Sequence, residues 1–238
     1  MIAFDQLVDE AWPATRTQEF DSWRLRYAGG VTKRANSVWP AGEPDDVEAA
    51  IEAAERFYAE RGLPAVFSIS ENAHPAELDR LLAQRGYELV DPTLVMTADL
   101  SKERPVTREV EIADAPSARW LEVWWSVDGR YVTDLATAKR IVTGVAATYA
   151  TAGQGVGRAV PQGEWLGIYC MAVPPRARRR GLAREVLHAL LNDGRARGAH
   201  RAYLCVTRQN TGARALYEQA GFQISGGYHY RVRQPTAS

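Results

Sequence analysis

The chain has 238 residues, which suits one large domain or two small ones, and 24% of them are charged, which argues against disorder. Lys+Arg and Asp+Glu number 29 each, so the formal net charge is zero and a nucleic-acid partner is not expected. No apolar run approaches the ~20 residues of a membrane span, and the N-terminus lacks the pattern of a secretory signal. These features predict a cytoplasmic protein without a membrane partner.

Two cysteines, Cys170 and Cys205, lie inside apolar runs. This placement predicts reduced thiols in a protein core rather than a disulfide or a metal site. We therefore expect no metal cofactor.

The first hundred residues show alternating strand and helix patterns. In chain order they predict two strands joined by a hairpin at Gly29-Gly30, then a helix, a strand, a second helix and two strands. These elements are expected at 23–27, 31–39, 44–61, 65–69, 75–85, 87–90 and 94–100. The polar segment 101–108 is the expected linker.

After this segment the patterns predict a strand, two helices, an ambiguous stretch that suggests a hairpin, a nine-residue strand, a helix, a strand, a helix and two final strands. These are expected at 109–112, 119–127, 134–141, 145–160, 165–173, 181–197, 202–206, 211–220, 222–224 and 228–232.

The two halves share the order of their elements and one short sequence similarity. LDRLLAQRGYELV ends the second helix of the first half, and ARALYEQAGFQIS ends its counterpart, so that Gly86 matches Gly221 and Tyr87 matches Phe222. The match indicates a duplicated unit, although chance similarity of two amphipathic helices remains open. We expect an α/β (α+β) fold with a mixed central sheet flanked by helices, in two domains at 1–100 and 109–238.

The segment MAVPPRARRRGLAR, residues 171–184, places a basic loop between a buried strand and a helix. The first amides of a helix lack internal partners and carry the positive end of its dipole, so they form an anion site. Gly181 lets a phosphate approach the backbone, and Arg178, Arg179 and Arg180 add positive charge. A solvated arginine loop is the alternative for the arginines alone.

Here the chain resembles the Gcn5-related N-acetyltransferases (GNAT). Their acetyl-CoA signature V-x-P-x-x-R-x-x-G-x-A is similar to VPPRARRRGLA, through Val173, Arg178, Gly181 and Ala183. Their later motif N-x-x-A-x-x-L-Y-x-x-x-G-F is matched from Asn210 to Phe222, with Tyr217 in the tyrosine position. The resemblance covers residues 109–233 and implies the GNAT fold and acetyl-CoA as cosubstrate.

The resemblance also implies roles for individual residues. The amides from Arg179 through Leu182 to Arg184 would bind the diphosphate, and Met171, Ala172 and Val173 would pair with the pantetheine arm. Asn210 would contact the pantetheine or anchor its helix. Tyr217 would protonate the leaving thiolate, and it is the expected catalytic residue.

Two departures from the family pattern qualify this interpretation. The glutamate base of some members falls at Gly167, so Glu164, Tyr169, His229, Tyr228 or a water would have to replace it. In the first half the loop is acidic and Leu82 takes the place of Tyr217, which indicates a degenerate copy without a cofactor. Arg26, Lys33 and Arg34 would meet an acidic acceptor group or be solvated.

The sequence predicts transfer of an acetyl group from acetyl-CoA to a primary amine of a small molecule. Acetylation of a protein N-terminus or lysine, and a non-catalytic acetyl-CoA sensor, are the alternatives, and a homodimer is possible. Trp120 and Trp124 share a helical face and are expected in the core, while Trp125 would line an acceptor pocket.

Overall fold

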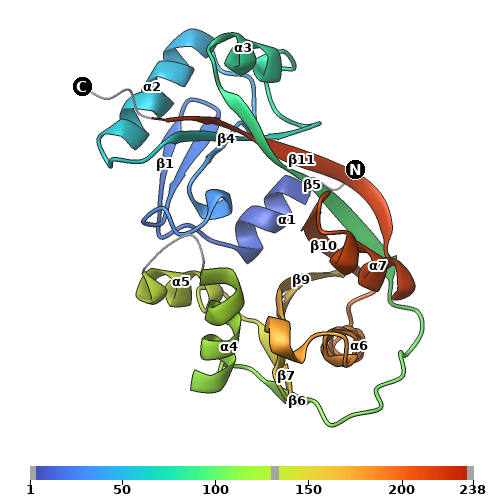
Figure 1. Cartoon of the computed structure of the whole chain (residues 1–238). Helices are drawn as coiled ribbons and strands as arrows, with labels where there is room; N and C mark the ends of the chain where they lie inside the picture. Colours follow the sequence, from blue (N-terminus) through green and yellow to red (C-terminus); the bar gives the residue numbers. More distant parts are fainter. Residues whose placement is uncertain (1–3, 130–133, 235–238) are drawn as a thin grey trace. The chain divides into compact units, whose positions relative to one another are not determined.

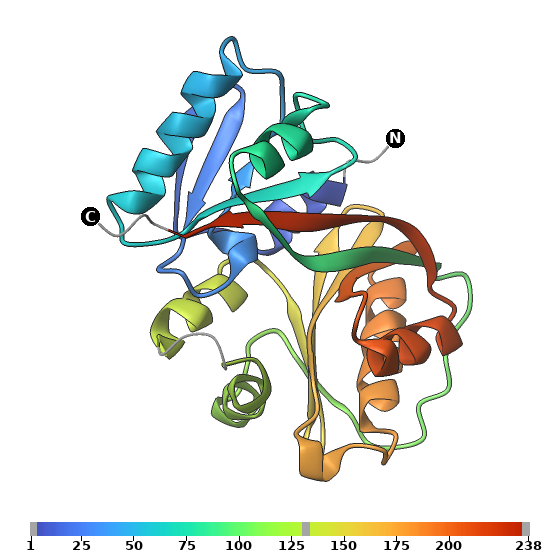
Figure 2. The same cartoon turned by 45° about the horizontal axis from the view of Figure 1, so that its top comes forward.

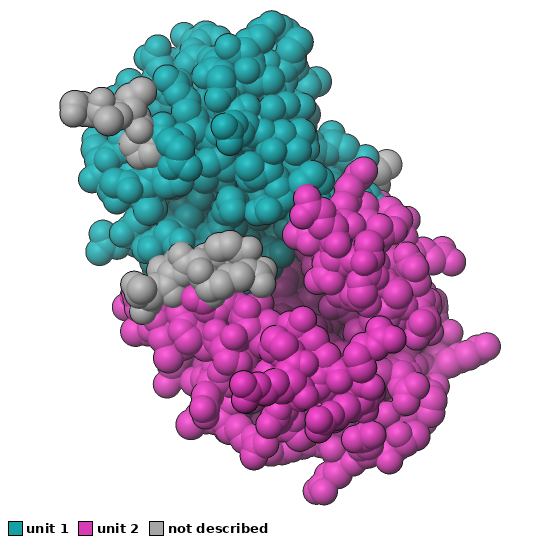
Figure 3. All heavy atoms as spheres, viewed as in Figure 1, with its two compact units in different colours: residues 1–93, 226–238 teal, residues 94–225 magenta. Residues whose placement is uncertain are grey.

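The computed structural model describes residues 4–129 and 134–234. The chain forms two compact units, Met1–Thr93 with Gly226–Ser238 as unit 1 and Leu94–Ser225 as unit 2 (Figure 3). These units do not coincide with the segments 1–100 and 109–238, because the last strand of each half of the sequence continues into the other unit.

Unit 1 contains a sheet in the strand order β1-β2-β3-β4-β11 (Figure 1). The β3 and β4 strands are parallel and the other neighbours of known register are antiparallel. Its strands are β1 Arg16–Phe20, β2 Trp23–Tyr27, β3 Val38–Trp39, β4 Ala65–Ser70 and the second part of β11 Gln223–Arg233. Its helices are α1 Phe4–Ala11, α2 Val47–Ala59 and α3 Leu78–Gln84.

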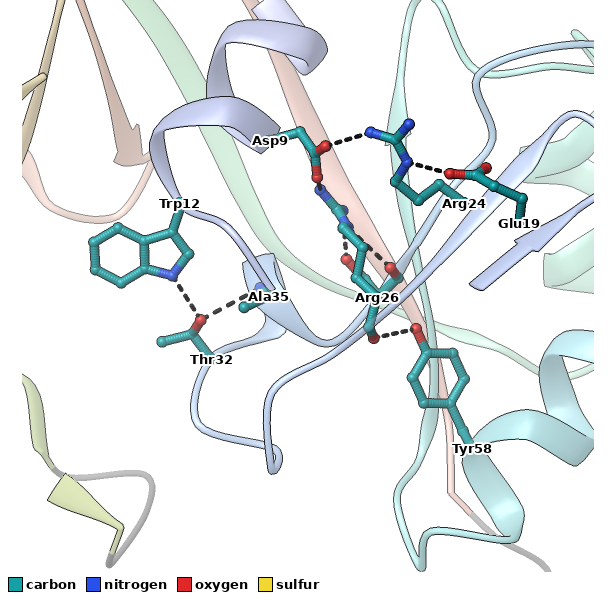
Figure 4. Close-up of polar contacts among 9 residues, drawn as sticks. Asp9, Trp12, Glu19, Arg24, Arg26, Thr32, Ala35 and Tyr58 are labelled. Atoms are coloured by element: carbon teal, nitrogen blue, oxygen red, sulfur yellow. Dashed lines mark hydrogen bonds and ion pairs between the residues drawn. The ribbon is translucent and has the colours of Figure 1, made fainter. Parts of the chain in front are cut away.

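The alternation of side chains along β2 determines how the helices of unit 1 pack. Trp23 and Leu25 belong to the apolar core formed with α2 and α3. Arg24 and Arg26 point to the other face, where both form ion pairs with Asp9 of α1, at 2.8 and 3.0 Å (Figure 4). The sheet is therefore covered on one face by α2 and α3 and on the other by α1.

The strands on either side of Gly29-Gly30 pair antiparallel, as the predicted hairpin requires, but the two glycines do not form a tight turn between them. The β2 strand forms its tight hairpin with β1, through Asp21 and Ser22, and reaches β3 only after a longer connection. In that connection the side chain of Asn36 accepts hydrogen bonds from the Ala28 and Gly30 amides, at 2.7 and 2.8 Å, which holds the glycines in a loop. The α1 helix and the β1 strand were not predicted.

Unit 2 contains strands in the order β5-β10-β9-β8-β7-β6, with the start of β11 beside β5. The strands are β5 Glu88–Asp99, β6 Glu111–Ala113, β7 Thr148–Ala152, β8 Gly155–Gln162, β9 Trp165–Ala172 and β10 Arg201–Thr207. The helices are α4 Ala118–Asp128, α5 Leu135–Val142, α6 Leu182–Ala196 and α7 Thr211–Gln219. The α6 helix covers one face of β7–β9 and α4 the other (Figures 1 and 2).

The segments 87–100 and 222–232, each predicted as two strands, form one strand each, β5 and β11. Pro92 lies within β5 and Gly226-Gly227 lies within β11. Pairing within a sheet overrides such weak local preferences. The mixed sheet flanked by helices is as predicted.

The segment 101–108 contacts α6 along one face. Glu185, His188 and Asn192 recur at the helical spacing and bind the backbone of Thr107, Pro105 and Arg104, at 2.7–2.9 Å.

Within the described residues, no helix combines the length and hydrophobicity needed to cross a membrane. Across the same part of the chain, no three His, Cys, Asp or Glu side chains gather as metal ligands would. Cys170 and Cys205 are not joined in a disulfide, and both are half-buried.

Candidate functional site

In the loop between β9 and α6, the backbone conformation leaves the first amides of the helix without a capping side chain. After β9 a short 3-10 helix, Pro175–Ala177, leads to Arg179 and Gly181, whose φ angles of +63° and +80° are left-handed. Gly181 adopts this conformation without strain, and it is the N-cap of α6.

The amides of this loop are disposed to bind an anion. Arg184 and Glu185 donate their amides to Gly181 O, at 3.0 and 3.1 Å, and so close the first turn. Among the described residues, no acceptor receives a hydrogen bond from the amides of 179–183, and no side chain caps the helix. These donors and the helix dipole point to the same place, as in other anion sites at helix N-termini.

The N-terminus of the corresponding helix of the first half, α2, is capped by a side chain of the protein itself. Asp46 precedes α2 and accepts hydrogen bonds from the amides of Glu48 and Ala49, at 3.0 and 3.1 Å. A carboxylate therefore occupies the position that a phosphate would need. The start of α6 offers an anion site that the start of α2 does not.

The arginines of the loop have different environments. Arg178 donates from Nε to Val173 O at 2.9 Å, which ties the loop to the end of the strand. Arg179 and Arg180 are exposed. Arg184 lies 3.4 Å from the buried carboxylate of Glu185. The three exposed guanidinium groups at 178–180 lie next to the open amides.

The edge of β9 becomes available just before the loop. The parallel register with β10 ends at the pair Ile168–Leu204, whereas the register with β8 continues to Ala172–Val156. Cys170 has a φ of +53° and lies in a β-bulge of this second pairing. Met171 and Ala172 therefore lie beyond the point where β9 and β10 separate.

Asn210 directly precedes α7, and Tyr217 lies within it. Asn210 is the N-cap and accepts from the Ala213 amide at 3.2 Å, so it anchors the start of the helix. The Tyr217 side chain is buried, with its ring 6.0 Å from that of Phe222. Burial raises the pKa of the Tyr217 phenol far above its ordinary value, and the charge of Asp128 raises it further.

The proposed substitutes for a base at Gly167 are scattered. Glu164 is exposed in the turn before β9, at the opposite end of that strand from the loop. Tyr169 is buried, and its hydroxyl lies 2.7 Å from that of Tyr203. His229 and Tyr228 belong to unit 1, where His229 pairs with Asp79 at 2.8 Å.

The cationic residues of the first half also belong to unit 1. Arg26 is buried and bonds to Asp9 and Ser37, so it is neither solvated nor available to a ligand (Figure 4). Lys33 pairs with Asp91 at 3.0 Å, and the Arg34 guanidinium lies 5.4 Å from the ring of Trp12.

The tryptophans of α4 divide as their spacing indicates. Trp120 and Trp124 are buried, and Trp125 is half-buried with its ring against Gly129. Asp128, which the sequence analysis did not single out, accepts from Trp124 Nε1 at 2.7 Å. In the sequence, only its position four residues after Trp124 could have indicated this hydrogen bond.

Comparison with known proteins finds that the chain is similar to proteins named as acetyltransferases. A family model described as "Probable histone acetyltransferase Rv0428c C-terminal" matches residues 3–233. The chain is 28% identical to the uncharacterised N-acetyltransferase YobR of Bacillus subtilis, over 97% of each chain.

Two solved structures show the same fold. A GCN5-related N-acetyltransferase from Kribbella flavida superimposes with a TM-score of 0.68 at 16% identity, covering 98% of this chain and 96% of that one. A tandem GNAT protein from the clavulanic acid biosynthesis pathway gives 0.62 at 11% identity, covering 98% and 88%. The chain thus belongs to the family of the Rv0428c C-terminal domain and is an N-acetyltransferase of the GNAT fold.

Proposed function

We propose that this enzyme transfers an acetyl group from acetyl-CoA to the primary amine of a small molecule, using the loop between β9 and α6. The main support is the set of open amides at 179–183, next to the point where β9 and β10 separate. The amides bind the diphosphate, and Met171 to Val173 pair with the pantetheine arm. Acetyl-CoA supplies the activated thioester.

In the reaction the amine nitrogen forms a bond to the acetyl carbon, and the bond from that carbon to sulfur breaks. Tyr217 gives its proton to the departing thiolate, solvent takes the proton lost by the amine, and Tyr217 then regains a proton from solvent. The raised pKa of Tyr217 keeps its hydroxyl protonated at neutral pH, as an acid requires.

An acetylation screen tests this function. The panel contains amino acids, aromatic amines, polyamines and peptides, and free thiol release reports turnover. Arg178→Glu with Arg180→Glu should weaken acetyl-CoA binding at least tenfold, because each reversal replaces attraction to the diphosphate by repulsion (about 1 kcal/mol or more per pair). Arg195→Glu with Arg197→Glu, at the other end of α6, is the matched control. Equal acetyl-CoA affinities in the two double variants would show that the loop between β9 and α6 does not bind the diphosphate.

The first half is proposed to be a degenerate copy that binds no cofactor. The Asp46 cap supports this, since it satisfies the amides that a phosphate would use. Titration calorimetry should give one acetyl-CoA per chain, unchanged in Glu43→Gln and Asp45→Asn. Two per chain would show an intact second site.

Acetylation of a protein N-terminus or lysine is the second candidate, because the matching family model carries the name of a probable histone acetyltransferase. Thiol release with peptides and with none of the small amines would favour it. Acetyl-CoA binding without turnover of any amine would instead support a sensor.

A further inference from the structure

Glycines let α6 lie close against the sheet near both of its ends. A Cβ atom at Gly155, the first residue of β8, would lie 3.0 Å from the Cβ atom of Leu182, the first residue of α6. A Cβ atom at Gly194, near the end of α6, would overlap the side chain of Leu166 on β9. Both contacts would be closer than ordinary van der Waals contact, so the helix keeps this spacing only while both positions are glycine.

The β7–β8 turn, residues 152–155, is the more rigid side of the contact between Gly155 and Leu182. Gly155 pairs with Ala152 across the hairpin, and Gly153 between them has a φ of +58°. Arg119 of α4 also donates from Nη2 to Gly153 O at 3.1 Å. Leu182 is less constrained, because no side chain caps the start of α6. An added methyl group at Gly155 would therefore displace Leu182 rather than the turn.

Leu182 belongs to the segment that the proposed function assigns to the diphosphate. Its amide is among those at 179–183 that bond to no acceptor among the described residues. Gly181, the residue before it, has a left-handed φ of +80°, which directs the chain into the helix. Hydrogen bonds weaken steeply as their angle departs from linearity, so a displacement of a few tenths of an ångström at Leu182 changes how these amides meet an anion.

We propose that Gly155 is a positioning residue for acetyl-CoA, because its lack of a side chain lets Leu182 touch the β7–β8 turn and so sets where the first amides of α6 lie. The inference rests on the proposed function, and Gly155 acts through Leu182. It predicts that added volume at 155 weakens acetyl-CoA binding, whereas added volume at 194, at the other end of the helix, does not.

Titration calorimetry with acetyl-CoA tests the role of Gly155. The φ angle of Gly155 lies outside the left-handed region, so Gly155→Ala adds a methyl group without backbone strain. The variant should raise the Kd for acetyl-CoA at least about threefold, because hydrogen bonds to a charged diphosphate lose their geometry. Gly155→Val should raise it further. An unchanged Kd in Gly155→Ala would overturn the proposal.

Gly194→Ala is the matched control, because it adds the same methyl group to a close contact of the same helix. Whatever its effect on thermal stability, it should leave the Kd for acetyl-CoA within about twofold of wild type. Without ligand, the backbone amide NMR signals of 179–183 should shift in Gly155→Ala and stay in Gly194→Ala. A Kd raised equally in both variants would show a general loss of packing and contradict a specific role of Gly155.

Removal of the other partner gives a rescue test, which also covers the case in which Gly155→Ala folds poorly. Leu182→Gly lacks the Cβ atom that the new methyl group would meet. Gly155→Ala with Leu182→Gly should therefore fold and bind acetyl-CoA as Leu182→Gly alone does, within about twofold. A double variant that does not fold, or that binds more weakly than Leu182→Gly, would contradict the proposal.

These measurements separate the inference from the proposed function on which it rests. A wild-type chain that binds no acetyl-CoA would overturn the proposed function, and the inference with it. Wild-type binding that Gly155→Ala leaves unaltered would overturn the inference alone.

Discussion

Tyr217 is buried, and the negative charge of Asp128 raises the pKa of its phenol. Burial is the larger cause of its raised pKa, because an ionised phenolate loses its hydration inside the protein. A raised pKa keeps the proton on the oxygen as the pH rises, so the acid form persists through the neutral and alkaline range. The phenol therefore keeps the proton that an acid role needs, and the same shift makes it a weaker acid than an exposed tyrosine.

The variant Tyr217→Phe keeps the ring beside Phe222 and removes only the hydroxyl. If Tyr217 is the acid, kcat should fall about 100-fold or more, with acetyl-CoA affinity unchanged. The wild-type kcat should not decline between pH 7 and about pH 10, the ordinary range below phenol ionisation. A pH–rate profile measures both effects, and full activity in the variant would exclude the acid role.

Motif and spacing were sufficient to predict some site residues and not others. The helix-starting glycine at 181 and the anchoring role of Asn210 follow from local chain geometry, which neighbouring residues determine. The contact between Tyr169, Tyr203 and Gln162 joins three strands, so it depends on tertiary packing that a single sequence does not reveal. The buried ion pair between Arg26 and Asp9 was missed for the same reason.

Among the elements, α6 is held at its start by the segment 101–108. Glu185 is 99% buried and accepts hydrogen bonds from the Thr107 amide, the Thr107 hydroxyl and the Arg108 amide, at 2.7, 2.9 and 3.3 Å. Burial alone would raise the pKa of Glu185, but these hydrogen bonds outweigh it and hold the pKa below its ordinary value. The carboxylate therefore stabilises the folded protein in its ionised form.

Replacing this carboxylate should give a pH-dependent loss of stability. Glu185→Gln should lower the free energy of unfolding by about 1–3 kcal/mol at pH 7, since hydrogen bonds to a charged acceptor are lost. Because the folded pKa is depressed, the difference from wild type is present above the unfolded pKa of about 4.3 and shrinks as the pH falls below it. Urea unfolding at pH 7 and pH 4 measures it.

The matched control for this prediction is Glu218→Gln, whose exposed carboxylate is 3.7 Å from Arg214 on α7. Its effect should stay within about 0.5 kcal/mol at both pH values. A Glu185→Gln variant as stable as this control would show that the segment does not hold α6.

Hydrophobic periodicity was enough to predict most helices and the strands β4, β9 and β10, whose apolar patterns are long or regular. The segment 145–160 was ambiguous and only suggested a hairpin, which β7 and β8 form. It failed at β1, where four of five residues are exposed, and at β3, which has two residues. It also divided β5 and β11, because the continuity of a strand depends on pairing with its neighbouring strands and not on the local pattern alone.

At the level of the whole molecule, each unit is completed by a strand from the other half of the sequence. The β11 strand pairs with β4 in unit 1, from Tyr228–Ser70 to Arg233–Ala65. The β5 strand lies beside β10 in unit 2, where Leu94, Met96 and Leu100 enter the core. The repeated order of elements was predictable from the sequence. The pairing of β11 with β4 and of β5 with β10 was not, because the residue pattern of a strand does not show which strand it pairs with.

The exchange predicts that residues 109–238 do not fold stably alone. Without β5 the core of unit 2 loses Leu94, Met96 and Leu100, worth about 5–9 kcal/mol together, which is comparable with the whole stability of a domain. Thermal unfolding by circular dichroism should show no cooperative transition in this fragment, while the full chain unfolds cooperatively. A fragment that melts like the full chain would contradict the assignment.

A crystal structure of the full chain with acetyl-CoA tests the central claim most directly. The account predicts one molecule per chain, its diphosphate within hydrogen-bond distance of the amides at 179–183 and its thioester in the opening between β9 and β10, facing Tyr217. A diphosphate bound anywhere else on the chain, including the start of α2, would contradict it.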